Sequence, residues 1–274
     1  MYVIRNGIIV QPDRLLFGYE LVVDADRIAA IQQQGTLEAE RAGAGVIDAH
    51  GGYVVPGLVD IHSDYIEGVI SPRPTVLMDF PTAFFEAERE LLGHGITTMY
   101  HSLSAYGRDV MDTKPVRAWE NTQRIMALIA ASKRTEGRNA HLIRHRLHLR
   151  LEIDNVGVVE DVARHIAAGE VDELSFMDHT PGQGQYRDLE IWRRSVRSDR
   201  ELSMEDALEV AKACEESPKI TLDALTSLAS LAREHGVPVA SHDDDTVEKL
   251  ELMQQLGCTI SEFPISLEVA AEAR

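Results

Sequence analysis

The chain has 274 residues, of which 45 are acidic and 27 are basic, and its formal net charge is −18. With 44% hydrophobic residues its composition is globular, and no apolar stretch approaches the roughly 20 residues of a membrane span. The charge excludes nucleic acid and anionic membranes as general partners, so any phosphate binding must be local. Cys214 and Cys258 are too few for a disulfide scaffold, and the N-terminus lacks the apolar segment of a signal peptide. These features indicate that the protein is located in the cytoplasm.

Residues 1–55 predict a small β-sheet domain. Asn6-Gly7 separates two short apolar runs, which is typical of a β-hairpin with a type I′ turn. Asp24-Ala25-Asp26 separates two further apolar runs in the same way. We therefore expect two hairpins in this domain and little helix.

From residue 56 to 274, strand and helix patterns alternate. Helical spacing of apolar residues appears in 81–95, 117–134, 158–169, 203–216, 221–236 and 246–256. Strand-like segments lie around them, at 58–61, 96–103, 145–153, 172–178, 237–243 and 258–264. The alternation predicts a parallel sheet, and its extent favours a barrel over an open sheet. We therefore predict an α/β chain in which 56–274 forms a TIM-like barrel.

The barrel pattern stops early. It breaks off within a last helical segment, 266–274, after six or seven strands. Fewer residues follow position 55 than the roughly 250 that a complete eight-stranded barrel uses. We expect the barrel to be incomplete and the chain to be truncated at its C-terminus.

Polar residues interrupt the first barrel strand where it ends. LVDI is apolar, and His62 and Asp64 follow it two positions apart, so in an extended strand both side chains point to one face. The carboxyl end of a barrel strand opens into the active-site mouth, where a nitrogen and a carboxylate suit a divalent metal. A polar strand end with a capping residue is the alternative.

Segment 145–153 alternates strictly between apolar and polar residues. In a barrel the leucines would pack on the helices, and His148, Arg150 and Glu152 would line the lumen. Buried charges are costly unless they are paired or coordinated. For Arg150 a simple ion pair with Glu152 is an equally good reading, whereas Glu152, nearest the strand end, favours metal coordination.

Two later strands also end in a histidine, His179 in MDH and His242 in ASHD. One such histidine alone is more often a structural group than a ligand. Strand ends that repeatedly deliver a histidine or an acid to the same level of a barrel indicate a metal site.

The segment after His179 reverses the charge of the chain locally. It contains the loop PGQGQ, with Gly182 and Gln183, followed by several arginines that begin with Arg187. Loop amides and guanidinium groups suit phosphate, although the later arginines also fit a solvated helix. Arg73, just past the first strand, is a further phosphate candidate. No P-loop motif occurs, and neither cysteine lies in a nucleophile motif.

The chain resembles the PhnM family, diphosphatases of phosphonate metabolism within the amidohydrolase superfamily. The similarity runs through essentially the whole chain, in the order GLVDIHSDY…PRP, GITTMYHSL, HRLHLRLEI, SFMDHTPGQGQY, ASHDDDT and ISEFP. The superfamily in general begins with HxH, whereas this family has HxD, as His62 and Asp64 do here. The resemblance implies a metal-dependent barrel with a small sheet domain built from both chain termini.

The resemblance also implies roles for single residues. His62 and Asp64 match ligands of the first strand, and Glu152 matches a fourth-strand carboxylate that can bridge metals. His179 and His242 match the histidines of the fifth and sixth strands. The implied cofactor is a divalent metal, with zinc the first choice, as one or two ions. Family members continue with GAPN…GGSHSGN and SSDY, which do not occur here, so their general-base aspartate has no counterpart.

The implied reaction converts α-D-ribose 1-methylphosphonate 5-triphosphate to the 5-phosphate and pyrophosphate, so the expected partner is a phosphorylated small molecule. Metal ions would activate water and polarise phosphoryl oxygens. One alternative is a dihydroorotase-like or aminoacylase-like carbon–nitrogen hydrolase, which shares the metals but does not need the arginine-rich loop. Another is an inactive, truncated remnant. The metal count and the oligomeric state, including a homo-oligomer, stay open.

Overall fold

The protein consists of two compact units, Met1–Leu58 and Val59–Arg274. The computed structural model describes residues 1–37, 43–73, 75–105, 115–134, 141–182, 184–186, 188, 190–192 and 204–274. Within these ranges, no helix is long and apolar enough to cross a bilayer.

The first unit contains two small β-sheets. Its strands are β1 (Tyr2–Arg5), β2 (Ile8–Val10), β3 (Leu15–Leu16), β4 (Tyr19–Asp24), β5 (Arg27–Gln33), β6 (Gly45–Asp48) and β7 (Tyr53–Val54). One sheet has the order β5-β4-β1-β6, and the other has the order β3-β2-β7. Val3, Ile9 and Val22 are among its buried side chains, so each sheet contributes to the interior of this unit.

The two predicted hairpins have different outcomes. β4 and β5 form the expected antiparallel pair, and Ala25 in their turn has a φ of 50°. The prediction of a hairpin between β1 and β2 is wrong, because β1 pairs with β4 and β6, whereas β2 pairs with β3 and β7. Asn6 does adopt the positive φ of a turn, 57°, but the chain uses it to pass between sheets. A Cβ on Gly7 would lie 2.6 Å from Val54 Cγ2, so only glycine fits this crossing.

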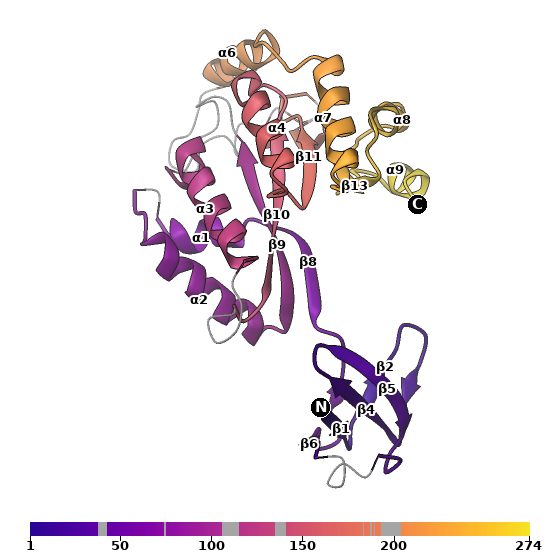
Figure 1. The fold of residues 1–274 in the computed structure, drawn as a ribbon. Helices are drawn as coiled ribbons and strands as arrows, with labels where there is room; N and C mark the ends of the chain where they lie inside the picture. The colour runs from indigo at the N-terminus through magenta and orange to yellow at the C-terminus, as the bar shows by residue number, and fades with distance from the viewer. Residues whose placement is uncertain are drawn as a thin grey trace. The chain divides into compact units, whose positions relative to one another are not determined.

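The second unit is built on a six-stranded sheet that curls into a half-barrel (Figure 1). The strands are β8 (Leu58–Ser63), β9 (Ile96–Ala105), β10 (Arg144–Glu152), β11 (Glu173–Met177), β12 (Val239–His242) and β13 (Ile260–Glu262). They follow one another across the sheet in chain order and are parallel from β9 to β13. A doubly wound open sheet would reverse its order at a switch point. The predicted incomplete α/β barrel is therefore confirmed.

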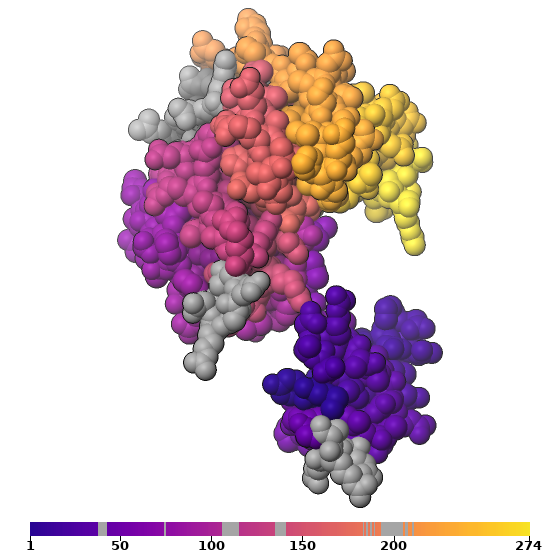
Figure 2. Space-filling view, in the orientation of Figure 1, coloured from indigo at the N-terminus to yellow at the C-terminus, as the bar shows by residue number. Residues whose placement is uncertain are grey.

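Helices connect the strands and cover the outer face of the half-barrel. They are α1 (Tyr65–Ile70), α2 (Phe80–Gly93), α3 (Trp119–Ser132), α4 (Val159–Ala167), α6 (Met204–Glu215), α7 (Leu222–Glu234), α8 (Val247–Leu256) and α9 (Leu267–Glu272). Short 3-10 helices, η1, η3 and η4, span Pro115–Arg117, Val156–Val158 and Gly184–Tyr186. α2 contacts α3, and α7 contacts both α4 and α8. Figure 2 shows the orange segment that contains α7 packed beside the yellow C-terminal segment that contains α8.

Capping residues set the ends of the helices. The Asp79 carboxylate accepts a hydrogen bond of 3.0 Å from the Thr82 amide at the start of α2. Gly95 follows the same helix with a φ of 81°, as expected for a glycine stop. Thr246 caps the start of α8 in the same manner, and Gly257 ends it at a φ of 102°.

The side chains of β10 separate the two faces of the half-barrel. Its leucines are fully buried in one core cluster with residues of α2 and α3, such as Phe84 and Ile129. The polar side chains of the alternate positions point the other way, toward the lumen, where His148 contacts serines of β9 and β11. The predicted division of this strand into an apolar outer face and a polar lumenal face is confirmed.

Candidate metal centre

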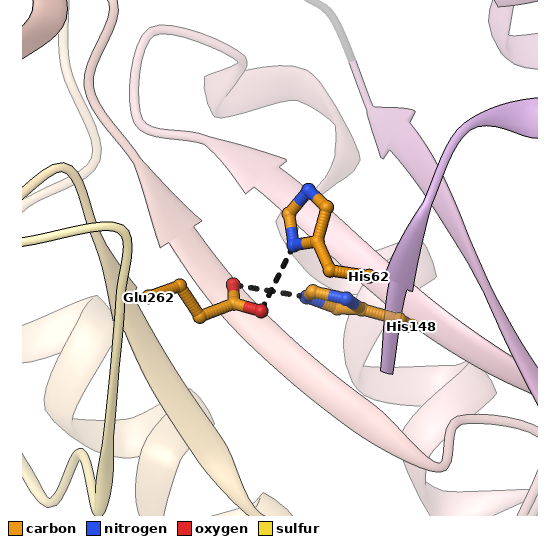
Figure 3. A group of neighbouring side chains, drawn as sticks. All are labelled: His62, His148 and Glu262. Carbon is orange, nitrogen blue, oxygen red and sulfur yellow. Dashed lines mark hydrogen bonds and ion pairs between the residues drawn. The ribbon is translucent and has the colours of Figure 1, made fainter. Parts of the chain in front are cut away.

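Two histidines and a glutamate meet in the lumen of the half-barrel. His62 Nδ1, on β8, lies 2.9 Å from Glu262 Oε1 at the end of β13. The other carboxylate oxygen, Oε2, lies 3.5 Å from Nε2 of His148 on β10. Figure 3 shows Glu262 facing both imidazole rings. The two strands at opposite edges of the sheet are thus joined by their side chains across the lumen.

His148 is held on both sides by serine hydroxyls. Ser102 Oγ lies 3.1 Å from its Nδ1, and Ser175 Oγ lies 2.8 Å from its Nε2. Burial, only partly offset by Glu262, lowers the pKa of His148 to about 4, so the ring is neutral at pH 7. A neutral imidazole is the form that binds metal ions.

The Glu262 carboxylate stays ionised. Its burial by itself raises the pKa, but the hydrogen bond with His62 and the neighbouring histidines hold the pKa below its usual value. The lumen therefore presents a charged carboxylate beside the neutral imidazole of His148.

Four of the five predicted ligands are linked by close contacts around this cluster. His242, at the end of β12, is in register with Glu262, and its ring centroid is 5.2 Å from that of His62. The ring of His179 lies 6.3 Å from that of His242. His179 Nδ1 lies 2.8 Å from Glu152 Oε1, which fixes the orientation of the imidazole.

Asp64, the fifth predicted ligand, is directed elsewhere. Its carboxylate lies 3.1 Å from a guanidinium nitrogen of Arg117, and its side chain is 58% exposed. Arg117 also bonds the buried Glu67. The alternation that would give Asp64 the same face as His62 applies only to extended backbone, and β8 has ended at Ser63, with Asp64 at a φ of −90° and a ψ of 14°. A role for Asp64 as a ligand stays a prediction.

The strand numbers implied by the resemblance differ from those of the sheet. Counted from β8 through the described strands, Glu152 ends the third strand, His179 follows the fourth, and His242 ends the fifth. The three residues nevertheless lie at or just after strand ends on one rim, because all carboxyl ends of parallel strands lie on the same side of a sheet.

The candidate phosphate ligands are dispersed. Arg150 is buried in the lumen, and its Nε has no hydrogen bond among the described residues. Among the described residues it forms no ion pair with Glu152, whose carboxylate bonds His179. Arg73 is exposed and forms a β-bridge with Val76. Gln183 and Arg187 lie outside the described residues.

The PGQGQ loop lies against the segment that follows His242. A Cβ on Gly184 would come within 3.2 Å of Asp243 Cβ, so the two backbones are in close contact. The Gly184 amide donates to Asp245 Oδ2 at 3.2 Å, and the Gly182 amide donates to the Tyr186 carbonyl at 2.9 Å. The described glycines of the loop thus lie near the segment that follows His242, and these two amides already have acceptors within the protein.

Two residues at the rim have strained backbone conformations. Asp243 and Phe263 have φ values of 51° and 53°, and each directly follows a residue of the cluster, His242 or Glu262. Positive φ costs energy for side chains of this size, and such strain concentrates at functional sites. The Asp243 amide donates to the Glu262 carbonyl at 2.9 Å, which ties the two turns together.

His148 and Glu262 were not among the metal ligands predicted from the sequence. Both carried a signal: His148 shares the lumenal face of its strand with Glu152, and Glu262 ends an apolar strand as His242 does. Their contact with His62 could not be read from spacing, because 200 positions separate His62 from Glu262 in the chain.

The donor set fits a divalent transition metal. Glu262 Oε2 and His242 Nδ1 are buried and make no hydrogen bond within the described part of the chain. Glu262 Oε2 has only the ion-pair contact with His148 Nε2 at 3.5 Å, and His242 Nδ1 has only that with Asp243 Oδ2 at 3.1 Å. Buried polar atoms without a hydrogen bond are costly, and a bound metal ion would stabilise them. Imidazole nitrogen and carboxylate oxygen are the donors typical of catalytic zinc sites.

The chain is similar in sequence to parts of known enzymes. No protein-family model matches the chain. The chain is 29% identical over 233 residues to α-D-ribose 1-methylphosphonate 5-triphosphate diphosphatase of Escherichia coli, which is 83% of this chain and 59% of that protein. It is also 42% identical to imidazolonepropionase of Anaeromyxobacter dehalogenans, but over 72 residues, 23% of this chain. The chain thus spans less than two thirds of the length of either relative.

Solved structures resemble the fold. A crystal structure of an amidohydrolase matches with a TM-score of 0.58 and 18% identity, covering 99% of this chain and 64% of the other. N-acetylglucosamine-6-phosphate deacetylase of Pasteurella multocida matches with a TM-score of 0.53 and 14% identity, covering 95% and 55%. The resemblance drawn from the sequence motifs is confirmed: the chain is similar in sequence to the diphosphatase of Escherichia coli and similar in fold to a solved amidohydrolase.

Proposed function

We propose that the protein is a metal-dependent diphosphatase that hydrolyses α-D-ribose 1-methylphosphonate 5-triphosphate to the 5-phosphate and pyrophosphate. The observation that carries the proposal is the gathering of His62, His242 and Glu262 in the half-barrel of a chain similar to the diphosphatase of Escherichia coli. Because the chain spans 59% of that relative, the proposal concerns the activity of the whole protein.

The lumenal side chains supply the ligands. His62, His242 and Glu262 would hold the metal, with His148 and the Glu152–His179 pair beside them. Glu152 accepts a hydrogen bond from Nδ1–H of His179, which fixes the orientation of the imidazole ring. A bound divalent ion would lower the pKa of its water and polarise the phosphoryl oxygens.

Arg150 is the described residue best placed to receive phosphate. It shares the lumenal face of β10 with His148 and Glu152, and its buried Nε makes no hydrogen bond in the described part of the chain. A buried guanidinium group is stabilised by a phosphate that accepts its hydrogen bonds. Because the net charge of the chain is −18, a polyphosphate ligand needs such a local cation to offset electrostatic repulsion.

Phosphorus NMR of the substrate incubated with the protein and Zn²⁺ tests this proposal. We expect pyrophosphate and α-D-ribose 1-methylphosphonate 5-phosphate to appear in equal amounts. We expect an Arg150→Lys variant to need a higher substrate concentration for the same rate. Stepwise release of inorganic phosphate would contradict the proposal, as would an inert triphosphate together with hydrolysis of a cyclic amide.

The second candidate is hydrolysis of a carbon–nitrogen bond. The local similarity to imidazolonepropionase favours it, since that match reaches 42% identity, although over 72 residues. Such a reaction uses the metal but has no polyphosphate to hold. Arg150→Lys would then leave the substrate requirement unchanged.

A cytoplasmic location fits the proposal. Neither Cys214 nor Cys258 forms a disulfide, and Cys258 is buried. Burial raises the pKa of the Cys258 thiol to about 12, so this cysteine is protonated and unreactive at neutral pH.

A further inference from the structure

A second histidine–carboxylate cluster lies on the opposite face of the same sheet. Glu88 of α2 directs its Oε2 at two imidazole rings, with His141 Nδ1 and His145 Nε2 each 2.9 Å away. His145 is the second residue of β10, and His141 lies in the segment that leads into that strand. Glu88 and His145 are buried, whereas His141 keeps 14% of its side chain exposed. None of these residues contributes to the lumenal site.

The three donor atoms have the spacing of a metal site. All of them lie within 4.8 Å of one another. Ligands bound tetrahedrally to zinc at about 2.0–2.1 Å are about 3.3 Å apart. The two distances of 2.9 Å need to open by only a few tenths of an ångström, a shift that side-chain rotation supplies.

The surroundings resemble the outer shell of a metal site. His101 Nε2 lies 2.9 Å from Nδ1 of His145, so it can fix the tautomer in which Nε2 of His145 faces the cluster. Nδ1 of His101 is buried and makes no hydrogen bond in the described part of the chain. Phe84 packs on His145 with ring centroids 4.2 Å apart, and Phe85 stacks on His141 at 5.5 Å. Burial lowers the pKa of both His101 and His145, which keeps these rings neutral.

We propose that Glu88, His141 and His145 form a second, structural site for a divalent transition-metal ion such as Zn²⁺, separate from the lumenal centre. The donor set of two imidazoles and one carboxylate is a zinc-type set that leaves a fourth position for water. A cavity of about 260 Å³ beside His141 and His145 gives access to it. Of the three cations on its wall, Lys133 and Arg146 are paired with Asp172, which reduces their repulsion of an incoming ion, and Arg144 is exposed to solvent.

Such an ion would fasten a helix to the sheet. Glu88 belongs to α2, whereas the two histidines belong to the start of β10 and the segment before it. Binding to the folded state alone stabilises a protein in proportion to the logarithm of the ion concentration over Kd. Loss of the site should therefore lower the melting temperature in zinc and leave hydrolysis unchanged.

The test counts zinc in matched variants. The wild-type protein, His141→Asn and His165→Asn are equilibrated with Zn²⁺, freed of unbound metal and analysed by mass spectrometry. His165 is the control, because its Nδ1 also bonds a glutamate, Glu170, at 2.7 Å, yet it belongs to neither candidate metal group among the described residues. We expect His141→Asn to hold about one zinc fewer per chain than the wild type, and His165→Asn to match the wild type.

A second measurement separates this site from the lumenal one. In a His62→Asn/His242→Asn background, zinc should still bind and raise the melting temperature, and adding His141→Asn should remove that rise. Equal zinc content in His141→Asn and the wild type would overturn the proposal and leave a hydrogen-bonded His–Glu–His network without metal. The first comparison decides the matter even if the double variant does not fold, and neither result depends on the hydrolytic reaction.

Discussion

Strand β10 carries a histidine–carboxylate cluster on each of its faces, and the two clusters differ in how their polar atoms are satisfied. On the outer face, both imidazoles meet one oxygen of Glu88, and the cluster is covered by the rings of α2. On the lumenal face, Glu262 Oε2 lacks a hydrogen bond among the described residues. The residue that follows Glu262, Phe263, has a strained backbone.

This difference indicates different roles. The outer cluster, in which both imidazoles are hydrogen-bonded to Glu88, joins a helix to the sheet and contributes to stability. The lumenal cluster lies at the carboxyl rim of parallel strands and has buried polar atoms without hydrogen bonds and strained turns. These features are typical of a site that binds a ligand. The same residue types therefore serve different purposes on the two faces of one strand.

The sharpest test of this comparison removes the carboxylate from each cluster in turn. We expect Glu262→Gln to lower turnover by about 100-fold or more, because loss of a group that only orients a metal ligand already costs about 10- to 100-fold. Glu88→Gln should leave turnover within about twofold and lower the melting temperature. Steady-state kinetics and thermal unfolding of the two variants give the answer. Similar losses of activity in both would show that the two faces are not functionally distinct.

A second test uses the pH dependence of stability in the lumen. Burial, with the nearby charge of Glu262, raises the pKa of Glu173 from 4.5 to about 7. The folded state therefore binds more protons than the unfolded state between these pH values, so this group's contribution to stability is lost as pH rises from about 4.5 through 7. Glu173→Gln should remove that loss and stabilise the protein at pH 8 by at most about 3 kcal/mol.

Urea unfolding at pH 5 and pH 8 measures this effect. At pH 5 the wild-type Glu173 is still protonated in the folded state, so the variant should differ little from it. A destabilised Glu173→Gln at pH 8 would mean that the ionised carboxylate has a stabilising partner in the lumen.

The smallest expected effect concerns the loop beside His242. Gly184 has a φ of 55° and approaches Asp243 closely, so Gly184→Ala should destabilise the protein by about 1–2 kcal/mol. Gly68, in α1, has open space around it, and Gly68→Ala should stabilise by about 0.5–1 kcal/mol. Thermal unfolding compares the pair, and an unaffected Gly184→Ala would show that the loop does not depend on this contact.

Local sequence signals predicted most of the elements. The helices that begin after Asp79 and Thr246 and stop at Gly95 and Gly257 follow from capping chemistry, which involves neighbours in the chain. The alternation in β10 predicted which of its side chains face the lumen. His62, Glu152, His179 and His242 were identified because polar residues at the end of an apolar strand are unusual.

Tertiary structure decided which of these elements and residues meet. Asn6 adopts the turn conformation that the sequence predicts, yet β1 and β2 enter different sheets, because pairing depends on which distant strands offer hydrogen bonds. Asp64 forms an ion pair with Arg117 and is not directed at His62, because its backbone is not extended beyond the end of β8. The sequence by itself thus determined local conformation and the barrel class. The partners of each charged side chain were decided by the curl of the sheet, which brings Glu262 to His62 across 200 positions of the chain.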